Sequence, residues 1–223
     1  MALSSTAFTA ADLAQWQTTL LGDSAEPADL SRFADTLSAV SGGATAVVDC
    51  TSSDAIAALY PSWLTRGLHV VTPNKKGFSG EMSLFREIER LASSPLGPSV
   101  YHEATVGAGL PVLSTLNDLV RTGDRIIKIE GIFSGTLSYL FNNFSAPGAS
   151  HSFSACVAVA KANGYTEPDP RDDLNGMDVA RKVTILGRVA GLDIGTDTLP
   201  VENIVPEALR GVSTAEEFME RLP

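Results

Sequence analysis

Hydrophobic positions in the first half of the chain switch between runs typical of buried strands and spacings typical of helices. Short apolar runs rich in β-branched residues predict buried strands at 45–50, 68–73 and 98–104. Apolar positions three and four residues apart predict helices at 55–67 and 79–94. Because strands and helices alternate over short connections, the sequence predicts an α/β fold with a parallel, doubly wound, Rossmann-like sheet.

Helical spacing also occurs before the first strand, at 11–21 and 28–40. A complete doubly wound fold of this kind would begin with a strand and a glycine-rich loop, so we expect the sheet to be incomplete. Pro61 lies inside the predicted helix 55–67 and is expected to kink or split it, while Ser53 can cap its start.

The pattern changes after residue 104. Alternation over 124–135 predicts a long strand from a sheet with one open face. We therefore expect residues 1–104 to be a partial nucleotide-binding domain and residues 105–223 to be an α+β substrate-binding, catalytic and dimerisation domain. The helices predicted in this second part are 110–123, 136–144, 153–164 and 178–192.

Composition narrows the class of protein. The 223 residues are 44% hydrophobic and 19% charged, and no apolar run approaches the roughly 20 residues that span a bilayer. The first basic residue is Arg32, so the amino end lacks the charged region of a signal peptide, and we expect a cytoplasmic protein. A net charge of −10 without a basic stripe argues against a nucleic-acid partner. Cys50 and Cys156 form no CxxC motif and are expected to be free thiols.

Polar residues follow the predicted strands, where parallel α/β sheets bind their ligands. They are Thr51, Ser52, Asn74, Lys75 and Glu103. Lys75, in the run TPNKK, would point into the crevice at this edge of the sheet, although a solvated loop lysine is an equally simple interpretation.

Glycines in the run 101–111 would allow backbone carbonyls to approach a ligand or a hard cation closely. The simpler alternative is that these glycines only form a turn. The chain lacks the GxGxxG nucleotide fingerprint, because Gly107 and Gly109 are followed by Val112 at the third glycine position. Either the protein binds no dinucleotide, or its amino end has been lost.

The most informative stretch is 160–182, an acidic loop that runs into a helix. Asp178 and Lys182 lie one helical turn apart. The simplest interpretation is a surface ion pair that stabilises the helix by about 0.2–0.5 kcal/mol. The alternative is a pocket that binds a substrate ammonium on carboxylates and presents a lysine to the reacting carbon.

This stretch resembles the signature of the homoserine dehydrogenase family, and especially its short fungal form. The signature positions are filled without a gap by Ala160, Gly164, Tyr165, Thr166, Asp169, Pro170, Asp173, Leu174, Gly176, Asp178 and Lys182. The likeness extends to DCTSS (49–53), TPNKK (72–76), YHEATVGAGLP (101–111), TGD (122–124) and KIEGIFSGTLSYLFN (128–142).

The resemblance implies an enzyme that interconverts L-aspartate 4-semialdehyde and L-homoserine in threonine and methionine biosynthesis. Lys182 would donate the proton that completes reduction, and Lys75 would orient substrate and nicotinamide. Glu167 and Asp178 would bind the substrate ammonium, and nearby carboxylates favour the charged form of Lys182. The pocket would also be lined by Gly135, Thr136, Tyr165 and Asp173.

The resemblance also implies a cofactor, a cation and a partner. NADP or NAD would contact Thr51, Ser52, Lys75 and Gly164. A monovalent cation, usually sodium in the family, would take Glu103 and the backbone carbonyls of Val106, Ala108 and Leu110. A homodimer is expected, with 124–135 in the interface.

The chain departs from the family pattern at both ends, where we expect the first strand, the glycine loop and a carboxyl-terminal part to be missing. We therefore expect this polypeptide to bind the cofactor weakly and to turn over slowly or not at all. The alternative function is a non-catalytic module that binds substrate or associates with another subunit.

Overall fold

A three-stranded parallel sheet forms the centre of the first half of the chain in the computed structural model, which describes residues 10–22, 27–40 and 44–223. Its order is β1 (Ala46–Val48), β2 (His69–Val71) and β3 (Val100–Tyr101). In register, Val48 lies beside Val71, and Val71 beside Tyr101. The parallel α/β sheet predicted from the sequence is therefore confirmed.

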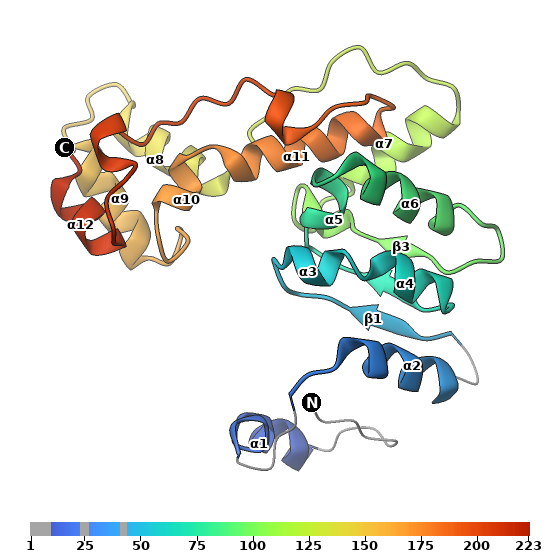
Figure 1. The fold of residues 1–223 in the computed structure, drawn as a ribbon. Helices are drawn as coiled ribbons and strands as arrows, with labels where there is room; N and C mark the ends of the chain where they lie inside the picture. The colour runs from blue at the N-terminus through green and yellow to red at the C-terminus, as the bar shows by residue number, and fades with distance from the viewer. Residues whose placement is uncertain (1–9, 23–26, 41–43) are drawn as a thin grey trace.

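Helices cover one face of this sheet (Figure 1). The predicted helix 55–67 is split, as expected, into α3 (Asp54–Ala57) and α4 (Tyr60–Thr65), and Pro61 stands in the first turn of α4. Ser53 caps α3 by accepting the amide of Ile56. The chain then forms α5 (Lys76–Ser79), which the periodicity did not predict, and α6 (Met82–Ala92).

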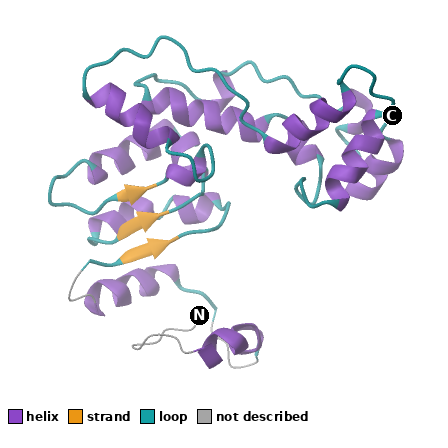
Figure 2. Cartoon of the chain, turned by 180° about the vertical axis from the view of Figure 1, so that it is seen from behind, coloured by secondary structure: helices purple, strands orange, loops and turns teal. Residues whose placement is uncertain are grey.

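The opposite face of the sheet is bare when seen from behind (Figure 2). The exposed fractions of Val48, Val71 and Tyr101 are 65%, 37% and 60%, whereas Val47 and Val70, which point the other way, are buried. The strands were predicted to be buried on both sides, so this expectation is wrong for one face among the described residues. The register of the three exposed residues makes that face a continuous apolar strip.

Two helices precede the sheet, as predicted. They are α1 (Ala10–Leu21) and α2 (Leu30–Val40), and α2 flanks β1 at the sheet edge (Figure 1). Ala34 is buried against the sheet core, and Phe33 and Leu37 pack beside it. Helix α2 is therefore part of the core of the first half.

After residue 102 the described chain consists of helices and loops, without a strand. Glu103–Thr105 is a single 3₁₀ turn rather than part of a strand. The helices are α7 (Val112–Arg121), α8 (Gly135–Phe144), α9 (Phe153–Ala162), α10 (Arg171–Leu174), α11 (Met177–Val189) and α12 (Ala215–Arg221). Short 3₁₀ turns lie at Thr196–Thr198 and Glu207–Leu209.

The strand predicted at 124–135 is not formed, and this expectation is wrong. Residues 125–134 form a loop that runs along α11 (Figure 1). A strand needs a neighbour that supplies backbone donors and acceptors, and none of the described residues pairs with this segment. Ile127 and Ile132 are consequently 94% and 81% exposed.

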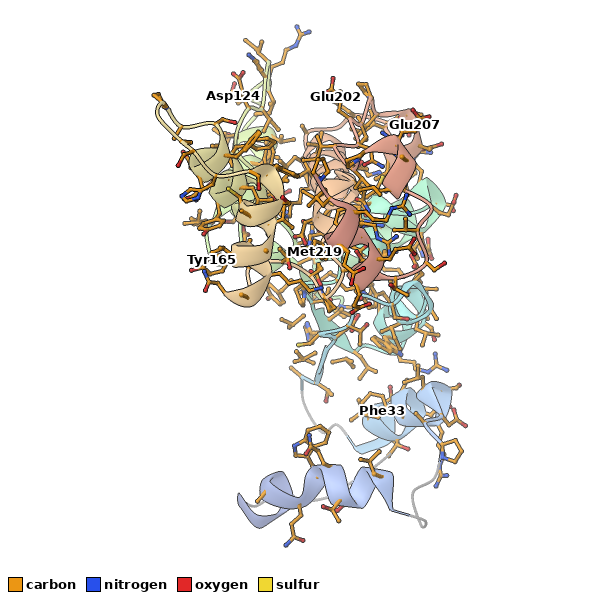
Figure 3. The ribbon with its side chains drawn as sticks, turned by 90° about the vertical axis from the view of Figure 1, so that its left-hand side faces the viewer. Phe33, Asp124, Tyr165, Glu202, Glu207 and Met219 are labelled. Carbon is orange, nitrogen blue, oxygen red and sulfur yellow. The ribbon has the colours of Figure 1, made fainter. Side chains whose placement is uncertain are left out.

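Two hydrophobic cores organise the molecule. The first lies under the sheet and includes Tyr60, Phe78 and Ile88. The second lies among α8, α9, α10 and α12 and includes Leu140, Val157 and Phe218. Figure 3 shows Tyr165 and Met219 in the helical part and Phe33 near the other end of the molecule.

Helix α11 connects the two parts, because it starts beside α10 and ends against α5 and α7 (Figure 1). Arg188, near its carboxyl end, is buried. Its guanidinium donates to the carbonyls of Phe78 at 2.8 Å, Gly80 at 2.8 Å and Ile194 at 2.9 Å. The bonds to Phe78 and Gly80 hold α11 against the carboxyl end of α5. None of the helices in the described ranges is both long and apolar enough to cross a membrane.

Candidate functional site

Two lysines from distant parts of the chain meet on one carboxylate. The Nζ atom of Lys182 lies 2.6 Å from Oδ2 of Asp178, and the Nζ atom of Lys75 lies 3.3 Å from Oδ1 of the same residue. The structure therefore brings together the two lysines proposed for catalysis and one of the two proposed ammonium ligands.

The backbone explains this meeting. Asp178 and Lys182 lie one turn apart on α11, and Lys75 lies at the start of α5, four residues after β2 ends. Gly176, directly before α11, has a φ of +76°, which favours glycine. A Cβ atom there would lie 2.9 Å from Cγ1 of Val201 and 3.1 Å from the carbonyl oxygen of Glu202. The direction of α11, and hence of Asp178, depends on a glycine at this position.

The charge of Asp178 is stabilised by the lysines. Burial is the largest single influence and acts to raise the pKa of Asp178, but the hydrogen bond from Lys182 and the charge of Lys75 together hold it below its ordinary value. The carboxylate is thus ionised at neutral pH and can keep two ammonium groups close together.

Lys182 has a second partner on the loop before α8. Its Nζ atom donates to the carbonyl of Phe133 at 2.7 Å. Ser134 caps α8 by accepting the amide of Leu137 at 3.1 Å, and Gly135 is the first residue of the helix. No atom would contact a Cβ at Gly135 within 4 Å, so there is open space beside it.

Thr136 connects this helix start to the acidic loop. Its Oγ1 atom donates to the carbonyl of Tyr165 at 2.6 Å, and the ring of Tyr165 makes an edge contact with Tyr139 at 5.1 Å between centroids. Gly164, with a φ of +71°, ends α9 in a Schellman motif, because the amide of Tyr165 donates to Ala160 and that of Gly164 to Lys161. Thr136, proposed for the substrate pocket, therefore lies beside Tyr165 and near Gly164, which was proposed to contact the cofactor.

Glu167 and Asp173 also lie close together, but the contact between them involves the backbone of Glu167 and not its carboxylate. The carboxylate of Asp173 accepts the amide of Glu167 at 2.8 Å. The carboxylate of Glu167 is exposed and, among the described residues, makes no hydrogen bond or ion pair. The structure thus leaves Glu167 open to a ligand without joining it to Asp178.

A buried polar cluster, missed as a unit by the sequence analysis, supports the two loops after β1 and β2. We call Asp49, Tyr60, Thr72 and Asn74 the strand-end cluster; all four are at most 4% exposed. Asp49 accepts the Tyr60 hydroxyl, the Asn74 amide at 3.0 Å and the backbone amide of Thr51 at 2.7 Å. Thr51 and Ser52 themselves are exposed at the carboxyl end of β1.

Burial acts to raise the pKa of Asp49, but the hydrogen bonds from Tyr60, Asn74 and Thr51 outweigh it and lower the pKa. The pKa of Tyr60 is raised, first by burial and then by its bond to Asp49. The pair is therefore a carboxylate with a neutral phenol. A polar residue directly after each strand was the only sequence signal for this cluster.

The loop proposed for a cation lies at the start of α7. The carboxylate of Glu103 caps this helix, accepting the amides of Leu113 at 2.6 Å and Ser114 at 2.9 Å. Ala108 has a φ of +53°, unusual for a residue with a side chain. Within the described residues, the carbonyls of Val106 and Ala108 accept no hydrogen bond, whereas that of Leu110 accepts the amide of Val112.

Backbone carbonyls are oxygen ligands of the kind that hard cations take. No cluster of three acidic, histidine or cysteine side chains occurs in the described part of the chain. His102, before this loop, stacks on Phe78 at 3.9 Å. Burial lowers the pKa of His102 to about 4, against the opposing charge of Glu103, so its ring is neutral.

A cavity of about 450 Å³ lies beside the first turns of α11. It is lined mostly by apolar residues, among them Leu137, Val179 and Val183, with Gly176 and Glu202 at its wall. The cavity lies on a face of α11 next to the helix start that carries Gly135 and Thr136.

The fold and the site define the class: an α/β protein whose Rossmann-like parallel sheet is joined by one helix to a helical part, with one lysine from the sheet-containing part and one from α11 meeting on a carboxylate. Comparison with known proteins identifies the family. The family model for homoserine dehydrogenase matches residues 111–222, and the model for the NAD binding domain of homoserine dehydrogenase matches residues 3–102. The chain belongs to the homoserine dehydrogenase family, a family of NAD(P)-dependent oxidoreductases.

Individual relatives agree. The chain is 57% identical over 187 residues to homoserine dehydrogenase of Paracoccidioides brasiliensis. This alignment covers 81% of this chain and 50% of that protein. It is 52% identical over 216 residues to the chloroplastic bifunctional aspartokinase/homoserine dehydrogenase 1 of Arabidopsis thaliana, covering 95% of this chain and 23% of that one. The chain therefore spans half or less of the length of these relatives.

A solved structure shows the same fold over almost the whole chain. It is that of a Candida auris protein described as of unknown function, with a TM-score of 0.83 and 45% identity. The match covers 95% of this chain and 59% of that one.

Proposed function

We propose that this chain catalyses the homoserine dehydrogenase reaction, the interconversion of L-aspartate 4-semialdehyde and L-homoserine. The observation that carries the proposal is the meeting of Lys75 and Lys182 on Asp178. The carboxylate of Glu167, in the acidic loop before α10, is exposed. Two cations and two carboxylates suit a substrate that has an ammonium group at one end and a carbonyl to be reduced at the other.

Lys182 is the proton donor. Reduction of a carbonyl builds negative charge on its oxygen, and an ammonium held in place stabilises that charge before giving up a proton. The two bonds of Lys182, to Asp178 and to the carbonyl of Phe133, fix the direction of its Nζ atom. Lys75 supplies a second positive charge and orients the substrate. A bound nicotinamide cofactor would supply the hydride.

Asp178 and Glu167 bind the substrate ammonium. A carboxylate offers about four lone-pair sites, so Asp178 can accept an ammonium in addition to its two lysines. Its side chain is 44% exposed, which leaves it accessible. Gly135, Thr136, Tyr165 and Asp173 line the same pocket and shape the loop that presents Glu167.

Residues 1–104 act as a nucleotide-binding unit for NADP or NAD, and residues 105–223 as the substrate-binding and catalytic unit. Thr51 and Ser52 are exposed polar residues at the carboxyl end of a parallel strand, where such cofactors bind. With Lys75 and Gly164 they form the proposed contact surface.

A monovalent cation such as sodium would bind the loop of Glu103, Val106, Ala108 and Leu110. The free carbonyls of Val106 and Ala108 and the left-handed backbone at Ala108 favour this site. The carboxylate of Glu103 serves α7, so Glu103 would contribute its backbone oxygen, which accepts the amide of Val106 at 3.3 Å and has a second lone pair for a cation.

We also propose that the protein is cytoplasmic and forms a homodimer through 124–135. This segment exposes Ile127 and Ile132 and forms no strand ladder with any of the described residues. A second copy can supply the missing strand neighbour, since two such segments related by a two-fold axis can pair with each other.

Two measurements test the proposed reaction. Calorimetric titration of the chain with L-homoserine should show saturable binding that weakens at least tenfold in Asp178→Ala. Incubation of NADPH and L-aspartate 4-semialdehyde with excess chain should produce homoserine. Binding without any homoserine formation would favour the non-catalytic module instead, and absence of both would reject the proposal.

A further inference from the structure

Asn74 lies at the centre of the strand-end cluster. Its side chain makes separate hydrogen bonds to the loop after β1 and to the loop after β2. Its Nδ2 atom donates to the carboxylate of Asp49 and to the carbonyl of Ser53, both at 3.0 Å. Its Oδ1 atom accepts the backbone amide of Lys76 at 3.1 Å. One side chain therefore bonds to the loop after β1 and to the loop after β2.

The residue between these contacts is Lys75. Asn74 precedes it, and the amide of Lys76 follows it, so the backbone of Lys75 is held on both sides by the same side chain. The amide of Asn74 is itself fixed by Oγ1 of Thr72 at 2.9 Å, and Thr72 Oγ1 donates to the carbonyl of Asp49 at 2.8 Å. The position from which the Lys75 side chain reaches Asp178 is thus set by buried hydrogen bonds.

We propose that Asn74, supported by Asp49, is a positioning residue that sets the ammonium of Lys75 against Asp178. The same side chain keeps the loop of Thr51 and Ser52 at a fixed distance from Lys75. The catalytic consequence of this positioning rests on the proposed function, in which Lys75 orients the substrate. The placement of the ammonium itself is a property of the folded chain and is measurable without turnover.

The physical argument is one of rigidity. Lys75 has a long side chain with a strongly hydrated charge, and an exposed ion pair alone would not hold it in one place. Its side chain is only 25% exposed, and its 3.3 Å contact with Asp178 spans from α5 to α11. A fully hydrogen-bonded buried network underneath removes the freedom of the backbone from which the side chain starts.

The test uses Asn74→Leu, which keeps a similar volume and loses all three side-chain bonds. Amine labelling by reductive methylation, followed by mass spectrometry, reports the accessibility of each lysine in the full chain. We expect labelling of Lys75 to become at least fivefold faster. Labelling of Lys182 should not change, because Asp178 and the carbonyl of Phe133 still hold it.

Asn142→Leu is the matched control. It makes the same change of side chain on α8, where the Nδ2 atom of Asn142 donates to the carbonyl of Ser138 at 2.8 Å, outside the strand-end cluster. Labelling of Lys75 should therefore stay within twofold of the unmodified chain. If Asn74→Leu does not fold, Asn74→Ser, which is too short to reach both loops, should give the same direction with a smaller change.

Homoserine formation separates this proposal from the proposed function. With NADPH and the aldehyde, Asn74→Leu should form homoserine at least tenfold more slowly, and Asn142→Leu should not. Unchanged labelling of Lys75 in a folded Asn74 variant overturns the positioning role. Faster labelling of Lys75 with no homoserine formed by any chain would support the positioning role and reject only the reaction.

Discussion

The Nζ atom of Lys182 lies 2.6 Å from Oδ2 of Asp178, one turn earlier on α11. On an isolated helix such an ion pair would lie on the surface and would stabilise the helix by only a few tenths of a kcal/mol. Here the other oxygen of the carboxylate faces Lys75 from the sheet-containing part of the molecule. At Asp178, therefore, a carboxylate of α11 contacts one lysine of its own helix and one lysine from the sheet-containing part.

Asp178→Asn should loosen both lysines at once. The amide keeps the shape of the side chain but loses the negative charge that holds two ammonium groups. We expect homoserine affinity to fall by at least tenfold in calorimetric titrations. The control Asp172→Asn removes an exposed acid from α10 and should leave the affinity within twofold; equal losses in both variants would argue for a general charge effect.

Arg188→Met should destabilise the fold. It leaves the carbonyls of Phe78, Gly80 and Ile194 without the donor that reaches them, at a cost of about 3 kcal/mol in the free energy of unfolding. Urea denaturation measures this change. Arg86→Met is the control, because Arg86 pairs with Asp193 at an exposed site and should cost less than about 1 kcal/mol. Similar values for both would mean that Arg188 does not hold α11 in place.

The order of helices and strands could be predicted from the sequence to a large extent. Capping by Ser53, the break near Pro61 and the glycine that ends α9 are local signals, and the structure confirms them. Likewise, the spacing of Asp178 and Lys182 placed both on one helix face. These features depend on residues within a few positions of one another.

The strand-end cluster could not be found in this way. Asp49 is 11 residues from Tyr60 and 25 from Asn74, and their contact depends on parallel pairing of β1 with β2. The failed strand at 124–135 has the opposite cause. Its alternating pattern is correct for a strand, but pairing requires a neighbour that periodicity cannot supply.

Acid should destabilise the protein in part through Asp49. Its folded pKa lies below the ordinary value, so its stabilisation is complete above the unfolded pKa and is lost as pH falls through the folded pKa. Asp49→Asn has no such titration. We therefore expect its free energy of unfolding, measured in urea from about pH 2 to 5, to fall less steeply with acid than that of the unmodified chain. Parallel curves for the two chains would contradict this assignment.

Ile127→Glu should weaken the proposed homodimer. A charge on each copy of 124–135 would face its equivalent across a two-fold axis, and the exposed isoleucine would be lost. Sedimentation equilibrium should show at least a tenfold higher dissociation constant. Leu96→Glu, at an exposed position between α6 and β3, is the control and should not shift the equilibrium. A monomeric unmodified chain would remove the dimer from the account.

The most direct test of the central claim compares the unmodified chain with Lys182→Met. Each is incubated in excess over NADPH with L-aspartate 4-semialdehyde, and homoserine is quantified by mass spectrometry; Lys128→Met, which removes an exposed lysine paired with Glu130, is the control. We predict slow homoserine formation by the unmodified chain and by Lys128→Met, and at least a hundredfold less by Lys182→Met. Homoserine formed by Lys182→Met at the unmodified rate would contradict the assignment of Lys182 as the proton donor.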